Sequence, residues 1–154
     1  AAGSSASVPP FAVQGLPIVK PPYGVLSAID LDRGELLWEV PHGDTPDIVR
    51  NHPALKGLTI PKTGQPLTYV GVVVTKSVVV VGDVMVTAPP GRPRGAMLRA
   101  YDKKTGQEVG AVWMPAPQSG SPMTYMLDGK QYIIVAVSGG NYSGEYLAFT
   151  LPNE

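Results

Sequence analysis

The chain of 154 residues contains no cysteine and carries no formal net charge. The absence of cysteine excludes a disulfide framework, a thiolate zinc site and a cysteine nucleophile. The even balance of 12 basic and 12 acidic residues leaves no electrostatic footprint for nucleic acid. With only two histidines, and nothing in the sequence that brings a serine beside either, no Ser-His-Asp hydrolase can be argued.

Long apolar runs are also scarce. The sequence has one run long enough to be considered as a membrane helix, and its residues do not favour that interpretation. Residues 70–88 are about as long as a membrane span, but Lys76 and Asp83 interrupt them. The run is rich in valine, whose branched side chain favours strands. We therefore expect two buried strands divided by a turn at Lys76-Ser77, and no membrane span.

The chain does contain a repeated motif, Ala-x-Asp-x-x-x-Gly. The first copy is Ala28, Asp30 and Gly34, closed by Trp38, and the second is Ala100, Asp102 and Gly106, with Gly110 at the closing position. A third, incomplete copy at residues 148–152 has the strand of the motif but lacks its aspartate turn. The last two copies lie about 48 residues apart, which is the length of one four-stranded propeller blade. The repeat predicts an all-β fold of the β-propeller type.

The residues of the motif are expected to be structural. An aspartate in such a turn accepts hydrogen bonds from backbone N–H groups downstream, and glycine supplies positive φ. We expect Asp30 and Asp102 to cap their hairpin turns in this way. Trp38 is expected to pack flat between neighbouring blades, with its indole N–H bonded to backbone.

The strand pattern divides the chain into hairpins. Apolar alternation, valine and isoleucine runs, and turn residues predict strands at 23–30 with 34–40, 72–75 with 78–82, 121–127 with 131–138, and 145–151. Asp128-Gly129 is a strong signal for a two-residue hairpin turn. Residues 1–14 are expected to be a flexible linker or tail and residues 15–152 the blades. Residues 42–66 are expected to be an inserted polar loop with one short helical turn at 53–57.

Several segments resemble the C-terminal region of quinoprotein dehydrogenases that depend on pyrroloquinoline quinone (PQQ), of the membrane glucose and alcohol dehydrogenase type. The resemblance is carried, in the family's order, by residues 21–30, 34–41, 98–106, 121–125, 129–132 and 145–152. It implies part of an eight-bladed propeller, with about two to three four-stranded antiparallel blades. The motif resembles the family's tryptophan-docking motif, from which Gly110 departs because the family usually has tryptophan there.

The resemblance also implies a chemistry. In the family, the quinone of PQQ takes a hydride from a sugar or alcohol, an aspartate acts as base and calcium acts as Lewis acid. The family's base and main calcium ligands lie in earlier blades, so no catalytic residue and no metal ligand is assigned in this chain. We expect the chain to be inactive alone. The resemblance further implies a periplasmic location and a substrate nearer to glucose and related polyols than to methanol.

Two groups of residues are candidates for a site. Tyr69, Val70 and Gly71 resemble a Trp-Gly-Gly step that contacts PQQ in the methanol-oxidising branch, which implies that Tyr69 stacks on the cofactor. The alternative is a rim or core aromatic. The insertion holds further candidates for metal ligands, namely His42, Asp44, Asp47 and His52. Their spacing matches no compact metal motif, and solvated loop residues are the alternative. The stretch Arg50-Asn51-His52 is a candidate for lining the substrate or quinone mouth.

Exposed strand edges in so short a chain invite pairing with other strands. The expected partners are therefore the remaining propeller blades, or sister copies that form a homo-oligomer. A non-catalytic propeller scaffold or binding module, which oligomerises through such edges, is the rival function.

Overall fold

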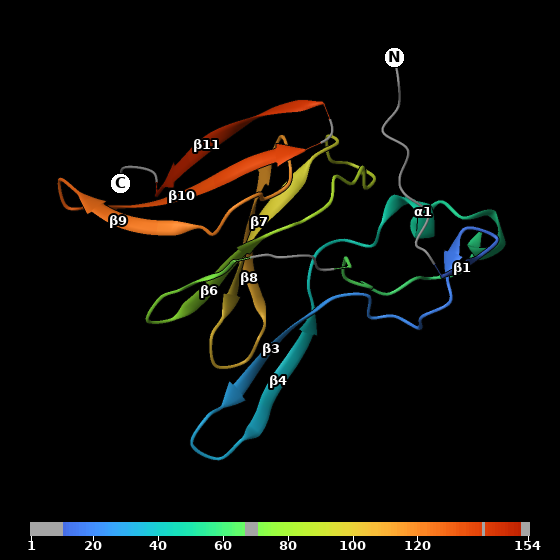
Figure 1. Cartoon of the computed structure of the whole chain (residues 1–154), viewed down its shortest axis with the longest axis horizontal. Helices are drawn as coiled ribbons and strands as arrows, with labels where there is room; N and C mark the ends of the chain where they lie inside the picture. Colours follow the sequence, from blue (N-terminus) through green and yellow to red (C-terminus); the bar gives the residue numbers. More distant parts are fainter. Residues whose placement is uncertain (1–10, 67–70, 140, 152–154) are drawn as a thin grey trace.

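Antiparallel β-sheets dominate the computed structural model of the chain, which describes residues 11–66, 71–139 and 141–151 (Figure 1). The strands are β1 (Ala12–Val13), β2 (Leu16–Pro17), β3 (Val25–Asp30), β4 (Glu35–Pro41), β5 (Val73–Val74), β6 (Val78–Gly82), β7 (Ala96–Asp102), β8 (Glu108–Met114), β9 (Met123–Leu127), β10 (Lys130–Gly139) and β11 (Tyr142–Thr150). Two helical segments, α1 (Asp47–Arg50) and η1 (Pro53–Leu55), lie between β4 and β5. The all-β class predicted from the sequence is confirmed.

The central sheet has four strands in the order β5-β6-β7-β8. A three-stranded sheet, β11-β10-β9, lies on one side of it, and the two-stranded sheet of β3 and β4 lies on the other (Figure 1). The predicted turn at Asp128-Gly129 joins β9 to β10, and both of its residues have positive φ, as a tight hairpin turn of this kind requires. The strand pairs predicted from the sequence are therefore confirmed.

The hydrophobic core lies between the central sheet and the three-stranded sheet. Its buried members are Val80, Ala96, Leu98, Met114, Ala116, Val135 and Val137. Val79 and Val81, on the opposite face of β6, are also buried, so β6 has no solvent-facing side. The neighbouring strand β5 differs, because it is an edge strand in which Val74 is 57% exposed. Only one of the two strands expected to be buried is thus fully covered.

The two complete copies of the motif have the same backbone geometry. Asp30 Oδ1 accepts hydrogen bonds from the N–H groups two and three residues later, at 3.0 and 3.1 Å. Asp102 Oδ1 accepts the equivalent pair at 2.9 Å each. Gly34 and Gly106 follow with φ of 69° and 72°. The strand register shifts directly after the alanine of each copy, so the repeat in sequence is also a repeat of turn and bulge.

Trp38 joins the first hairpin to the central sheet. Its indole lies over Gly106, where an added Cβ would be 2.6 Å from Cε3, and its Nε1 donates to the Lys103 carbonyl at 3.0 Å. Gly110 stands at the equivalent position of the second copy, and none of the described atoms lies within 4 Å of a Cβ placed there. The first copy therefore contacts the next sheet through its closing residue, and the second does not.

The insertion contains more helix than expected. The single helical turn predicted within residues 53–57 is confirmed as η1, and a second short helical segment that was not predicted, α1, precedes it. Asp47 begins α1 and Arg50 ends it, so each charge complements the helix dipole, and the two side chains form an ion pair at 2.9 Å. Pro46 before an acidic residue was the signal for this start.

The described part of the chain begins with the hairpin of β1 and β2. Most of the expected linker, residues 1–10, lies outside the described residues, and its expected end at residue 14 falls within the turn of this hairpin. The Gln14 carbonyl contacts Nε2 of His52 at 2.8 Å, which holds the hairpin beside η1. Among the described residues, no helix has the length and apolar character needed to cross a membrane.

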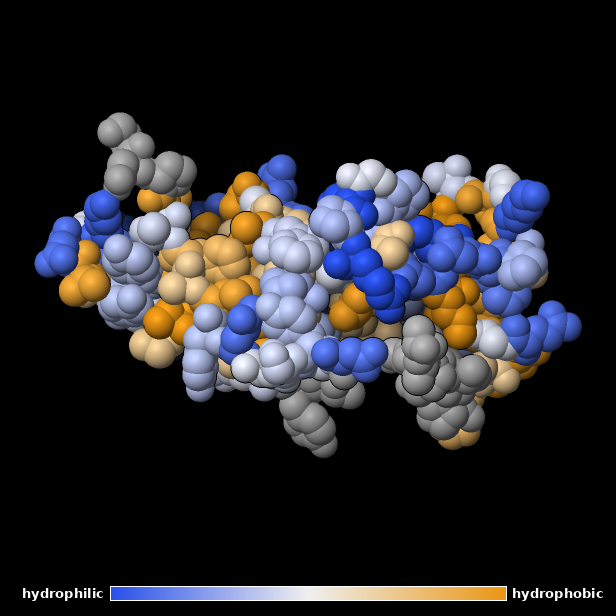
Figure 2. Space-filling view, turned by 90° about the horizontal axis from the view of Figure 1, so that it is seen from above, coloured by the Kyte–Doolittle hydropathy of each residue, from blue (hydrophilic) through white to orange (hydrophobic). Residues whose placement is uncertain are grey.

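Apolar side chains also reach the surface. On the face shown in Figure 2 they gather in several patches among hydrophilic residues. The hairpin of β3 and β4 contributes Ile29, Leu31 and Leu36, which are 57%, 90% and 59% exposed. Such contiguous apolar exposure is typical of a surface that another element covers.

Candidate functional site

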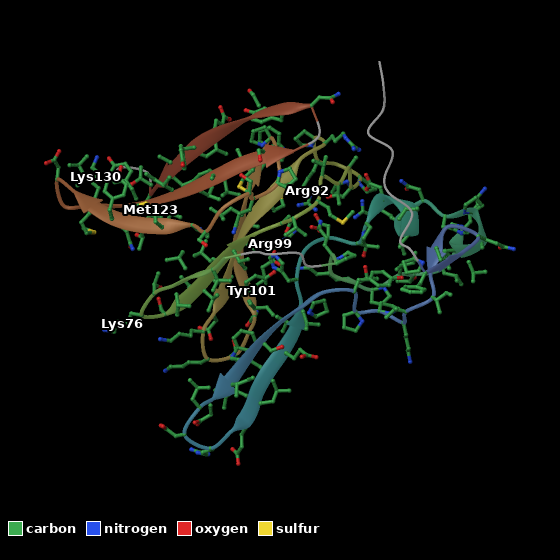
Figure 3. All side chains as sticks on the ribbon, in the orientation of Figure 1. Lys76, Arg92, Arg99, Tyr101, Met123 and Lys130 are labelled. Carbon is green, nitrogen blue, oxygen red and sulfur yellow. The ribbon has the colours of Figure 1, made fainter. Side chains whose placement is uncertain are left out.

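The most deeply buried ion pair in the described chain joins the central sheet to the segment after β6. Arg99 on β7 and Asp83 have side chains only 4% and 0% exposed. The guanidinium makes two parallel contacts with the carboxylate, Nε to Oδ1 at 2.7 Å and Nη2 to Oδ2 at 3.0 Å. Arg99 and Tyr101 project from the same strand near the centre of the molecule (Figure 3).

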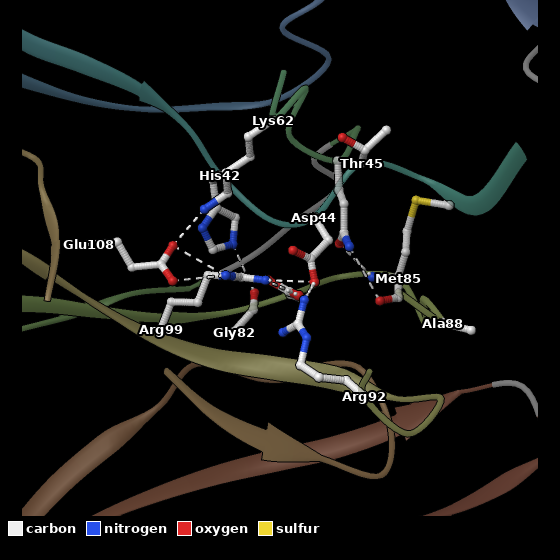
Figure 4. A network of polar contacts seen from close by, with 12 residues as sticks. His42, Asp44, Thr45, Lys62, Gly82, Met85, Ala88, Arg92, Arg99 and Glu108 are labelled. Carbon is white, nitrogen blue, oxygen red and sulfur yellow. Dashed lines mark hydrogen bonds and ion pairs between the residues drawn. The ribbon is translucent and has the colours of Figure 1, made fainter. Parts of the chain in front are cut away.

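Two further carboxylates surround this pair. Nη1 of Arg99 contacts Glu108 of β8 at 3.0 and 3.2 Å, and Nη2 contacts Asp44 of the insertion at 3.0 Å. Lys62 and Arg92 then bind Glu108 and Asp44 at 2.5 and 2.7 Å (Figure 4). We call these six side chains the ionic network. Its three cations and three carboxylates balance, and it clamps the insertion onto the central sheet.

The ionic network holds fixed charges. Burial alone lowers the pKa of Arg99, but the hydrogen bond and charge of Asp83, followed by Asp44 and Glu108, raise it above its ordinary value. Burial raises the pKa of Glu108, yet the hydrogen bond from Lys62 and the charge of Arg99 bring it below its ordinary value. Arg99 and Glu108 are therefore ionised at neutral pH, and the network has a positioning role.

His42 lies beside the ionic network and is only 1% exposed. Its Nε2 lies 3.1 Å from the Gly82 carbonyl, and its Nδ1 lies 3.0 Å from the Tyr101 hydroxyl. Because a carbonyl only accepts, Nε2 carries the proton and Nδ1 accepts from Tyr101. Burial lowers the pKa of His42 and raises that of Tyr101. His42 is therefore a neutral, fully bonded side chain in the folded state.

The lowered pKa of His42 makes stability depend on pH. The unfolded chain takes up a proton as pH falls below about 6.5, while the folded chain does not, so the contribution of His42 is complete above that pH and is lost below it. We expect urea unfolding to show falling stability from about pH 7 to 5. His42→Gln should flatten this slope, whereas an unchanged slope in the variant would show that another group is responsible.

The structure separates the four candidate metal ligands of the insertion. His42 is buried, so the alternative that it is solvated is wrong, and both of its ring nitrogens are occupied. Asp44 belongs to the ionic network, while Asp47 binds arginines and the N–H of Ala88. His52 bonds backbone with both nitrogens. Across the described residues, no three His, Cys, Asp or Glu side chains are grouped as metal ligands.

The expected cofactor-contacting step lies partly outside the described residues, since Tyr69 and Val70 are not among them. Gly71 is described, and its carbonyl accepts from Gln118 Nε2 at 2.7 Å. A Cβ at Gly71 would be 1.9 Å from the Ser121 hydroxyl, so only glycine fits. Gln118 also accepts from the N–H at the end of β6 at 2.6 Å. Gly71 is thus held in place by the loop that leads to β9.

Comparison with known proteins identifies the sheets. Residues 3–133 match the PQQ family, described as the glucose/ethanol/alcohol dehydrogenase β-propeller domain. The chain belongs to this family of PQQ dehydrogenase propellers. The four-stranded central sheet is therefore one propeller blade, and Trp38 docks one blade on the next. The resemblance and the partial-propeller fold expected from the sequence are both confirmed.

Curated relatives in the PQQ family are similar along most of the chain. A probable quinate dehydrogenase (quinone) of Xanthomonas campestris pv. juglandis is 34% identical over 149 residues, covering 90% of this chain and 17% of that protein. The quinoprotein glucose dehydrogenase of Escherichia coli K12 is 30% identical over 149 residues, covering 91% and 17%. The quinate/shikimate dehydrogenase (quinone) of Acinetobacter baylyi is 30% identical over 137 residues, covering 86% and 15%. The chain thus spans about one sixth of the length of these relatives.

The described residues do not fit PQQ and calcium as a complete seat. PQQ is a planar anion, so it needs free cations and an aromatic face, and calcium needs several oxygen ligands. The buried cation Arg99 is committed to carboxylates, and within the described ranges no buried side-chain polar atom lacks a partner. The only part of the expected cofactor step in view, Gly71, offers a carbonyl that Gln118 already binds.

Sequence reasoning missed the ionic network. A single charge stood in each of two apolar stretches, Arg99 within β7 and Asp83 directly after β6. Charged residues are almost never fully buried unless they are paired, so the two together were a signal for a buried ion pair. Gln118 gave no such signal, because its role depends on loops that meet only in the folded chain.

Proposed function

We propose that this chain is the C-terminal section of a larger PQQ-dependent dehydrogenase that oxidises a sugar, polyol or alcohol. The match of residues 3–133 to the PQQ propeller family carries this proposal. The docking of Trp38 on Gly106 supports it, because it is a contact between successive blades. The chain supplies blades to the propeller, and the catalytic base comes from elsewhere in the protein.

The substrate class follows from the shared chemistry of the relatives. The relatives include quinate, shikimate, glucose and glycerol dehydrogenases, whose substrates all carry several hydroxyl groups. A polyhydroxylated substrate is therefore favoured over a simple alcohol such as methanol. A periplasmic location and calcium as the metal partner of PQQ belong to the same proposal and rest on the resemblance to the family.

The proposal assigns a division of labour within the propeller. Gly71 contributes backbone to the cofactor's surroundings, and Gln118 and Ser121 fix its position. Tyr69 remains a hypothesis for the stacking residue. We expect other blades to supply the cations that bind the PQQ carboxylates and the ligands for calcium, because the buried cation Arg99 is engaged in the ionic network.

A chimera tests this function. We expect the isolated chain to show no calcium-dependent thermal shift or quinone absorbance change with PQQ. The same residues, placed in the E. coli glucose dehydrogenase in exchange for its matching segment, should restore PQQ binding and glucose oxidation above that of the truncated enzyme. Gly71→Val in the chimera should weaken PQQ binding. Saturable binding by the isolated chain would contradict the division of labour, and a folded chimera that binds no PQQ would contradict the function.

The rival function, a scaffold that forms a homo-oligomer through open edges, keeps one supporting observation. Among the described strands, β3, β4 and β11 each pair with only one other strand, so each has an open edge.

A further inference from the structure

One edge of the central sheet is formed by strand β8, which pairs only with β7 among the described strands. A propeller blade has four strands, so this sheet is complete, whereas the sheets of two and three strands each lack part of a blade. The rest of a propeller adds strands to those two sheets and none to β8. The opposite edge of the complete blade, β5, has only two residues. In the proposed larger protein, β8 is thus the longer edge of this blade and stays open.

The edge of β8 lacks the usual protection against pairing with another strand. Natural edge strands carry charges or proline, or a bulge twists them away. In β8 the bulge lies at Val109, where the register with β7 shifts, and the regular strand continues from Gly110 to Met114 without a charge or a proline. Among the described residues, no backbone group of this stretch bonds outside the pair with β7. The stretch therefore offers its free backbone groups to a further strand.

The side chains of residues 110–114 are complementary to a second copy of themselves. An antiparallel pairing about a two-fold axis at Val112 places Trp113 opposite Ala111, and Met114 opposite Gly110. Each large side chain then faces a small one, and Val112 faces its own copy as a β-branched pair. The stretch is uncharged and the chain has no formal net charge, so no like charges meet at the axis. These properties favour a second copy as the occupant of the edge.

Trp113 is already held in position for this contact. Its indole packs against Gly95, where an added Cβ would overlap Nε1, so the ring rests on its own blade. It is nevertheless 41% exposed, and Val112 is exposed to the same extent on the opposite face of the strand. Gly110 has open space beside it, with no described atom within 4 Å of an added Cβ. A second copy can thus be accommodated without a rearrangement of the blade.

We propose that two copies of the protein pair through the free edges of β8, antiparallel about a two-fold axis at Val112. The pairing joins the two central blades into one continuous sheet. The inference rests on the proposed function only in one respect, because it takes the edge of β8 to stay open when the other blades are in place. The contact is small beside a standard protein interface, so we expect a weak dimer with a dissociation constant in the micromolar range.

Sedimentation equilibrium of the full chain tests the pairing. We expect the mass to rise from 16.2 kDa toward twice that value as the concentration approaches about 200 µM. Val112→Lys and Val112→Glu should each weaken the dimer about tenfold or more, because like charges then face each other at the axis. Mixing the two variants should restore the dimer, which variants that had merely lost their fold could not do. Tyr146→Lys, at an exposed position of the edge strand β11, is the matched control and should leave the dimer unchanged.

The absence of cysteine from the chain allows a direct measurement of the axis. Opposite residues of an antiparallel pair have Cα atoms about 4.5–5.5 Å apart, which is close enough for a disulfide. Val112→Cys should therefore give a covalent dimer under mild oxidation, and Tyr146→Cys should not.

Three outcomes would overturn the proposal. The chain could stay monomeric at about 200 µM, or the dimer could survive Val112→Lys. A dimer that is lost on Tyr146→Lys and kept on Val112→Lys would assign the contact to β11 instead. No cofactor takes part in any of these measurements, so their failure is distinguishable from a failure of the dehydrogenase function, which the PQQ-binding chimera tests.

Discussion

Replacing Arg99 by methionine is expected to lower the free energy of unfolding by about 3–5 kcal/mol. Methionine fills most of the volume of the arginine stem, so the main loss is the charge that compensates Asp83. That carboxylate is fully buried and would be left with its closest cation removed. Urea denaturation at neutral pH measures the change. Asp44 and Glu108 would lose the same partner and would add to the destabilisation.

Two controls separate the buried charge from the loss of contacts. Arg99→Met combined with Asp83→Leu should recover much of the loss, because a buried ion pair is often replaceable by apolar residues of similar volume. Arg33→Met removes an exposed arginine, 70% accessible, from its pair with Asp30 and should cost no more than about 1 kcal/mol. A single Arg99→Met variant that loses less than the exposed control would show that the network contributes nothing.

Gly106→Ala is expected to destabilise the chain by about 3 kcal/mol, mainly by displacing Trp38. The new Cβ would overlap the indole at 2.6 Å, and φ of 72° strains any non-glycine residue. Gly34→Ala is a matched control, because it has nearly the same φ and open space around its Cβ. It should cost only the strain, about 1 kcal/mol.

The difference between these two glycine variants isolates the tryptophan contact between blades. Equilibrium unfolding gives the free energies, and Trp38 fluorescence reports whether the indole moves into water. If Gly106→Ala and Gly34→Ala cost the same amount and the fluorescence is unchanged, the indole does not stabilise the contact. A larger cost for Gly106→Ala with a shifted Trp38 spectrum supports it.

Local signals were enough to predict the hairpins. The chain reverses direction at the turns of Asp30 and Asp102 and at Asp128-Gly129. The hydrogen bonds and positive φ values that form these turns involve only residues close together in the sequence. The strands on either side follow from alternation and β-branched residues. The contact of Trp38 with the next blade was also predicted, because an indole buries a large apolar area and its N–H bonds to backbone.

The insertion could not be predicted in the same way. The polar sequence around His42 predicted a solvated loop residue. In the structure His42 is buried, and it contacts Gly82 and Tyr101, which lie 40 and 59 residues away in the sequence. Gln65 is likewise 0% exposed and bonds the N–H groups of Val84 and Met85. Such residues depend on the folding of one segment onto another, and no period or motif encodes that. The short helix α1 was not predicted because four residues are too few to show a helical period.

The central blade has two unlike faces, and this governs how it holds its neighbours. One face packs an apolar core against the three-stranded blade, while the other face binds the insertion through ion pairs. Apolar burial weakens on cooling. Burial raises the pKa of Glu108, but Lys62 and Arg99 bring it below its ordinary value, so acid that protonates Glu108 removes the stability of its ion pairs. Cooling therefore weakens the contact of the central blade with the three-stranded blade, whereas acid weakens its contact with the insertion. The two contacts fail under different conditions.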